Sequence, residues 1–204
     1  MNFMNHSNSS TNNDFSPLDL NKGDILDLEK EVPSLNHVIV AAGWDVNDAG
    51  KDNFDLDISA FLLNKDGRVT TPGKDVVYFK ALNRQGIYLE GDNLTGAGDG
   101  DDERIHVNLD ELDDYVDSIV FNVNIYECVQ KKQTFGMVKN SYIRLLDADN
   151  DEKEICRFRL NDDASSATAV VFAKLFRTNS GWSFEALGES LVVADLNKLL
   201  MRYM

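Results

Sequence analysis

A run of acidic residues and glycines between Glu90 and Glu103 has the composition of a loop that binds a hard metal ion. The sequence there, EGDNLTGAGDGDDE, supplies six acidic side chains, one Asn and four glycines, and glycine lets the backbone bend tightly. Ca²⁺ accepts six to eight oxygen ligands, including backbone carbonyls, so such a loop suits it better than Mg²⁺, which requires near-octahedral geometry. The run contains neither Cys nor His, which argues against zinc. It therefore predicts a calcium-binding loop.

A second acidic stretch, GWDVNDAGKDNFDLD, extends from Gly43 to Asp57. Asp55 and Asp57 enter an expected strand two residues apart, so their side chains leave the same face about 7 Å apart and could reach one ion. Leu56 and Ile58 then fill the opposite, core-facing side. Because two carboxylates at that spacing repel each other unless a cation compensates, we expect metal to stabilise the protein.

Three other interpretations of these acidic stretches are weaker or leave the function open. Acidic, glycine-rich stretches are common as solvated surface loops, and one such stretch alone is weak support for a metal site. An EF-hand is excluded by counting: from Asp99, loop position six is Arg104 rather than Gly, and position twelve is Asp110 rather than Glu. A phosphate-binding loop at residues 96–100 is disfavoured, because the surrounding carboxylates repel phosphate and no Gly-Lys-Ser/Thr follows.

The elements that must position these acids are mostly strands. From Leu18 onward, short apolar runs are separated by clusters of Gly, Asn and Asp, which is typical of an antiparallel β-protein. We expect the fold class to be mostly β, an antiparallel β-sandwich. Its expected strands cover residues 36–44, 56–63, 76–80, 86–90, 104–108, 121–125, 142–146, 154–160, 168–177 and 181–187.

Helix is scarce in this pattern. Residues 109–116 fit one short helix, and residues 191–204 place Val192, Leu196, Leu199 and Tyr203 on one face of a C-terminal helix, which we expect to cap the edge of the sandwich. Residues 1–17 are rich in Asn and Ser and show no apolar period. We therefore expect a disordered polar extension over residues 1–17 and a single β-sandwich domain over residues 18–204.

The net charge of −15 limits the classes of partner. A field of that sign repels phosphate backbones and anionic lipid, so direct binding of nucleic acid is not expected. The sequence contains neither a spanning apolar run nor a secretory leader, so we expect no direct membrane insertion and a cytoplasmic location. Cys128 and Cys156 each fall in an apolar, strand-like segment, where we expect reduced, buried thiols.

Several motifs resemble those of the TerD family of tellurite-resistance and stress-response proteins. They are GWDV at 43–46, FDLD at 54–57, GDNLTGAGDGDDE at 91–103, QTFGMVKNSYIRL at 133–145 and NDDAS at 161–165. The resemblance implies a calcium-binding, non-enzymatic β-sandwich of the bacterial cytoplasm. It also implies partners among the other proteins of a resistance gene cluster, some of them at the membrane.

The resemblance carries the metal-ligand positions of the family onto this chain. Asp45 is a further acidic candidate, and Leu56 and Gly100 are candidates to contribute carbonyl oxygens. Two or more Ca²⁺ ions are expected. The acidic ligand motifs of the family fall on Asp55, Asp57, Asp92, Asn93, Asp99, Asp101, Asp102 and Glu103.

Three functions remain open from the sequence. The first is a calcium-binding stress-response protein that acts through calcium-dependent protein interactions. The second is a metal-independent interaction scaffold whose acidic loops only confer solubility. The third is a metal-dependent phosphoesterase that uses a carboxylate-bound cation as a Lewis acid, and it is the weakest because no phosphate-holding Arg or Lys and no general base adjoins the acids.

Overall fold

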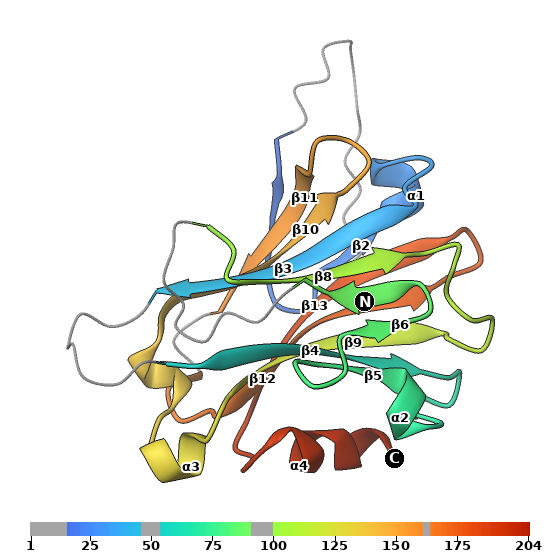
Figure 1. The fold of residues 1–204 in the computed structure, drawn as a ribbon. Coiled ribbons are helices and arrows are strands. Elements are labelled where there is room, and N and C mark those ends of the chain that lie inside the picture. The colour runs from blue at the N-terminus through green and yellow to red at the C-terminus, as the bar shows by residue number, and fades with distance from the viewer. Residues whose placement is uncertain (1–15, 46–53, 91–99, 161–163) are drawn as a thin grey trace.

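The computed structural model describes residues 16–45, 54–90, 100–160 and 164–204. Two β-sheets face each other across a shared core, with short helices at the periphery (Figure 1). The predicted β-sandwich is therefore confirmed. The extension predicted over residues 1–17 falls almost wholly outside the described residues, so it and the domain boundary drawn after it stay predictions.

One sheet has seven strands and the other has six. All hydrogen-bonded neighbours run antiparallel except β1 and β11, which are parallel. In spatial order, the first sheet is β1 (Leu18–Leu20), β11 (Lys153–Arg159), β10 (Lys139–Asp147), β3 (His37–Asp45), β8 (Glu103–Asn108), β7 (Ile87–Leu89) and β6 (Asn83–Arg84). The second sheet is β2 (Ile25–Asp27), β13 (Trp182–Leu191), β12 (Ala169–Arg177), β9 (Ser118–Ile125), β4 (Leu56–Leu63) and β5 (Val76–Val77).

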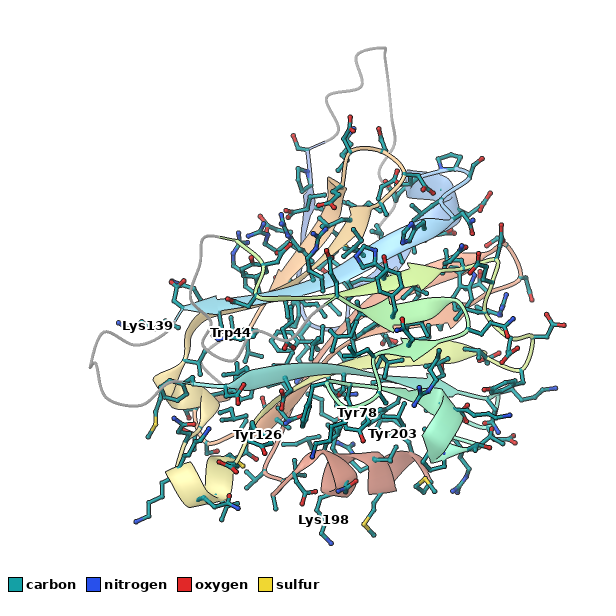
Figure 2. The ribbon with its side chains drawn as sticks, viewed as in Figure 1. Trp44, Tyr78, Tyr126, Lys139, Lys198 and Tyr203 are labelled. Atoms are coloured by element: carbon teal, nitrogen blue, oxygen red, sulfur yellow. The ribbon has the colours of Figure 1, made fainter. Side chains whose placement is uncertain are left out.

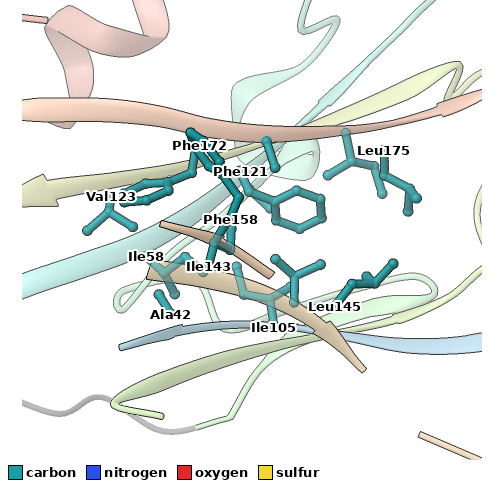
Figure 3. Packing of buried hydrophobic residues seen from close by; sticks show 14 of the residues in the cluster. Ala42, Ile58, Ile105, Phe121, Val123, Ile143, Leu145, Phe158, Phe172 and Leu175 are labelled. Carbon is teal, nitrogen blue, oxygen red and sulfur yellow. The ribbon is translucent and has the colours of Figure 1, made fainter. Parts of the chain in front are cut away.

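The main core lies between the sheets and follows from the two-residue period of the strands. Ile58 on β4 and Phe121 on β9 are fully buried and point toward the seven-stranded sheet. Ile105 on β8 and Ile143 on β10 are fully buried and come from the opposite side. Figure 3 shows these side chains meeting in the middle of the sandwich. The predicted core-facing phase of β4 is confirmed.

The helices are short, as expected. They are α1 (Leu28–Glu31), α2 (Pro72–Asp75), α3 (Cys128–Lys131) and α4 (Leu196–Leu200), with 3₁₀ turns η1 (Phe135–Met137) and η3 (Met201–Tyr203). Residues 109–116, predicted to be helical, form turns instead. The side chains of Leu109, Leu112 and Val116 are buried in the core although they come from turns. Cys128 is buried and free, but it begins α3 and does not lie in a strand as predicted.

The C-terminal helix covers a sheet face rather than the sandwich edge we expected. Leu199 on α4 is fully buried in a second apolar cluster with Phe61, Val120 and Val171 from the outer face of the six-stranded sheet. Figure 1 shows α4 lying along that sheet beneath β4 and β9. The helix also begins later than predicted, at Leu196, and Val192 is 74% exposed rather than part of the buried stripe.

Candidate metal centre

Strand pairing brings part of the predicted acidic set together. The antiparallel register places Ala42 on β3 opposite Glu103 on β8, so the end of β3 lies beside the start of β8. The Asp102 N–H donates to the Ala42 carbonyl oxygen at 2.9 Å, and the Trp44 N–H donates to Asp102 Oδ2 at 2.8 Å. This pairing places Asp102 beside Asp45, the last residue of β3. We name Asp45, Asp101 and Asp102 the acidic end.

The carboxylates of the acidic end act on one another through their charges. Burial raises the pKa of Asp102 above its ordinary value, and the hydrogen bond from the Trp44 N–H opposes this increase. The negative charges of Asp101 and Asp45 raise the pKa further. A raised pKa means that the charged form of Asp102 is disfavoured in this setting, and a bound cation would stabilise that form.

One carboxylate of the acidic end already has a cationic partner. Arg144 on β10 holds Asp101 with two hydrogen bonds, from Nε to Oδ1 and from Nη2 to Oδ2, both 2.7 Å long. The Asp101 side chain is only 7% exposed. The Tyr142 hydroxyl adds a third hydrogen bond to Asp101 Oδ1 at 3.1 Å, and burial together with the Asp101 charge raises the pKa of Tyr142 to about 12. Arg144 therefore neutralises the negative charge of Asp101.

Two glycines allow this packing. A Cβ on Gly43 would lie 2.4 Å from the Tyr142 ring, so a larger residue at that position would require the ring to move. Gly100 has a φ of +111°, a backbone conformation that side chains disfavour, and its carbonyl oxygen accepts from the Tyr142 hydroxyl at 3.0 Å. The Gly100 carbonyl oxygen, a predicted metal ligand, therefore already accepts one hydrogen bond.

Glu103 has a structural contact that the sequence did not reveal. Its side chain is 1% exposed and lies on the core-facing side of β8, in phase with Ile105. Glu103 Oε2 accepts from the Ile58 N–H of β4 at 2.5 Å. The carboxylate thus joins the two sheets at the end of the sandwich near the acidic end.

Leu56 and Asp57, at the C-terminal end of the second acidic stretch, lie elsewhere. Leu56 is fully buried in the core, and the Asp55 carbonyl oxygen accepts from the Tyr126 N–H at 2.7 Å. Asp57 is 5% exposed and lines a pocket on the outer face of the six-stranded sheet. Asp101 faces outward from the other sheet, since its partner Arg144 alternates with core-facing residues of β10. A single ion therefore cannot bind both Asp57 and Asp101.

Asp92, Asn93 and Asp99 lie outside the described residues. Within the described part of the chain, no three His, Cys, Asp or Glu side chains lie close enough together to hold a metal ion. The donors that the acidic end does bring together are oxygens from carboxylates, with the Gly100 carbonyl beside them. This donor set matches the preference of Ca²⁺.

Sequence reasoning missed a histidine pair on the outer face of the seven-stranded sheet. His37 Nε2 and His106 Nδ1 are 3.1 Å apart, and His106 Nε2 is 2.8 Å from Glu90 Oε2. The Tyr88 ring stacks on the His106 ring with centroids 4.4 Å apart. The register of β3 with β8 creates the pair, and 69 residues separate the two histidines in the chain, so no local motif could have indicated it.

The described helices contain no segment with the length and apolar character needed to span a bilayer.

Similarity to known sequences places the chain in a known class. The TerD domain model matches residues 17–203, and the chain belongs to the TerD family. It is 40% identical over 171 residues to the tellurium resistance protein TerD of Serratia marcescens, which covers 83% of this chain and 88% of that protein. It is 37% identical over 199 residues to the stress response protein SCP2 of Bacillus subtilis, which covers 91% of this chain and 98% of that protein.

A solved structure supports the fold. The crystal structure of a TerD homologue from Streptomyces coelicolor matches with a TM-score of 0.64 at 24% identity, covering 80% of this chain and 95% of that chain. At that identity the likeness bears on the fold alone.

Proposed function

We propose that this protein is a non-enzymatic, calcium-binding member of the TerD family that acts in a tellurite or chemical-stress response. The observation that carries the proposal is the acidic end, where burial and the negative charges of Asp101 and Asp45 raise the pKa of Asp102. Within the acidic end, Arg144 pairs with Asp101. A divalent cation beside Asp45 and Asp102 would relieve the remaining repulsion.

Calcium would be held there by oxygen ligands. Asp45, Asp102 and the Gly100 carbonyl would provide described ligands, and the neighbouring segment 91–99 carries Asp92, Asn93 and Asp99 in the sequence. The bound ion would supply positive charge that links two strand ends. Asp55, Leu56, Asp57 and Glu103 stay predicted ligands, and the position of Asp57 on the outer face of the other sheet fits more than one ion.

The names of the relatives support the biological part of the proposal. Those relatives are named for tellurium resistance in Serratia marcescens and for stress response in Bacillus subtilis. We propose that this protein works in the cytoplasm and that calcium controls its binding to other proteins of a resistance cluster, among them a membrane protein.

Thermal unfolding in calcium and in chelator tests the calcium site. We expect CaCl₂ to raise the Tm of the wild-type protein, because a ligand that binds only the folded state stabilises it. Asp102→Asn removes the central carboxylate and should abolish the rise. Asp110→Asn, at an exposed position on a turn, is the matched control and should preserve it. An equal rise in wild type and Asp102→Asn would refute the assignment.

Affinity capture from a cell that carries the resistance cluster tests the partner proposal. Capture of cluster proteins should fall when chelator replaces calcium. Equal capture under both conditions would support the metal-independent scaffold instead. Turnover of a phosphoester substrate that depends on added divalent metal and is lost in Asp102→Asn would support the phosphoesterase.

A further inference from the structure

A pocket separate from the acidic end lies on the outer face of the six-stranded sheet. Its volume is about 630 Å³, within the range of sites that bind small molecules. The walls come from α4, from the segment that leads from β9 into α3, and from the connection between α2 and β6. The pocket therefore lies where the C-terminal helix leaves part of the sheet uncovered.

The floor of the pocket presents hydrogen-bond acceptors. Asp57 on β4 and Asn124 on β9 are direct cross-strand partners, line the pocket and are each 5% exposed. The Asn124 Oδ1 atom is buried and has no hydrogen-bond partner among the described residues. Because an unpaired buried acceptor is costly, this atom indicates a missing donor.

The walls beside this floor are aromatic. The rings of Tyr78 and Phe79 meet edge to face with centroids 5.5 Å apart, and Phe79 meets Tyr126 in the same way at 5.8 Å. Figure 2 shows Tyr78 and Tyr126 on the side of β4 that faces α4. A row of aromatic rings suits an apolar body or an ammonium group, which is attracted to ring faces.

Charged side chains of both signs complete the lining. Arg84 on β6 and Lys80 before it are cationic, and the Arg84 Nε atom is buried without a hydrogen-bond partner in the described part of the chain. Glu127 and Asp195 line the pocket as well. Asp195 already accepts from the Lys198 N–H at the start of α4, at 2.9 Å. The pocket thus has an unmet acceptor on its floor and an unmet donor on a different element.

We propose that this pocket binds a small zwitterion that carries a primary ammonium and a carboxylate, as free amino acids do. The ammonium donates to the Asp57 carboxylate and to Asn124 Oδ1. The carboxylate accepts from Arg84, with Lys80 adding positive charge, and the body of the ligand packs on Tyr78 and its aromatic neighbours. Each unpaired buried atom of the pocket then has a partner of the opposite kind.

A two-dimensional amide NMR titration tests the proposal with three probes that share a phenyl ring on a short carbon chain. The probes are L-phenylalanine, 2-phenylethylamine, which lacks the carboxylate, and 3-phenylpropanoate, which lacks the amine. L-Phenylalanine should shift amides in segments 78–84, 124–127 and 194–197. Each probe that lacks one charged group should bind at least about tenfold more weakly, as expected for loss of a charge-assisted hydrogen bond.

Variants test which side chains of the pocket bind the ammonium and the carboxylate of the ligand. Asn124→Leu and Arg84→Met should each weaken L-phenylalanine binding at least about tenfold. Asn122→Leu is the matched control, because Asn122 is fully buried on the same face of β9 but does not line the pocket. Its affinity should equal that of wild type. Arg84→Met keeps the test valid if Asn124→Leu fails to fold.

Three outcomes would overturn the proposal. The first is the absence of pocket shifts with every one of the common amino acids, and the second is equal affinity for L-phenylalanine and 2-phenylethylamine. The third is a pocket shift caused by CaCl₂ alone and abolished by Asn124→Leu, which would make the pocket a metal site. Failure of calcium binding at the acidic end would not affect this inference, since the pocket lies on the other sheet.

Discussion

Arg144→Met is the sharpest structural test of the network beside the acidic end. Arg144 makes two 2.7 Å hydrogen bonds to Asp101 and one of 2.8 Å to Glu154, and these two side chains are 7% and 14% exposed. Burial opposes the charged form of Glu154, but hydrogen bonds from Arg157 and Arg144 keep its pKa below the ordinary value. Methionine preserves the aliphatic stem and leaves two largely buried carboxylates without their shared partner.

The expected cost follows from these contacts. Hydrogen bonds to charged groups contribute about 1.5–3 kcal/mol each, but the Arg144 side chain is 24% exposed, so solvent screening reduces their sum. We expect a loss of about 2–3 kcal/mol in the free energy of unfolding. For a chain of this size that loss corresponds to a fall in Tm of about 5–10 °C.

Urea unfolding in chelator, monitored by circular dichroism, measures this change. The matched control is Arg159→Met, because the Arg159–Asp19 ion pair is 57% and 76% exposed and should contribute less than about 0.5 kcal/mol. A stability of Arg144→Met within about 0.5 kcal/mol of wild type would refute the reasoning, as would an equal loss in the Arg159 variant.

Three further predictions concern pH, the C-terminal helix and thiol chemistry. The folded-state pKa of Asp102 is raised, so the folded protein without calcium should gain stability from this group as the pH falls through that pKa. The calcium affinity should fall over the same pH range. Calorimetry at several pH values would show both changes. Leu199→Ala, at a fully buried site on α4, should cost about 2–5 kcal/mol in urea unfolding, whereas Met201→Ala, at a side chain 64% exposed, should change stability by less than about 0.5 kcal/mol. Burial raises the pKa of Cys156, so this thiol should resist Ellman's reagent in the native protein, and rapid native modification at Cys156 would contradict the structure.

The sequence predicted strands correctly where the local pattern of apolar side chains determines the structure. β4 occupies residues 56–63 as predicted, because its apolar side chains alternate between two buried faces. The strand expected over 76–80 ends at Val77, because Tyr78 and Ala81 pair with each other in a tight turn. The apolar spacing over 109–116 suggested a helix, but buried side chains on turns produce the same spacing.

The site was only partly predictable, since its contacts depend on which strands become neighbours. The sequence identified Asp101 and Asp102 as members of one acidic cluster. It could not show that Arg144, which lies 43 residues from Asp101, neutralises that carboxylate, or that Glu103 joins the two sheets. It also placed Asp57 with the other acids, whereas the pairing of β4 and the position of α4 put it at the floor of a separate pocket.

Calorimetric titration of the chelator-treated protein with CaCl₂ tests the central claim most directly. The account predicts saturable binding to the wild-type protein, loss of binding at the acidic end in Asp102→Asn, and unchanged binding in Asp110→Asn. Absence of saturable binding to wild type at millimolar calcium would contradict the claim, and so would an Asp102→Asn isotherm that matches that of wild type.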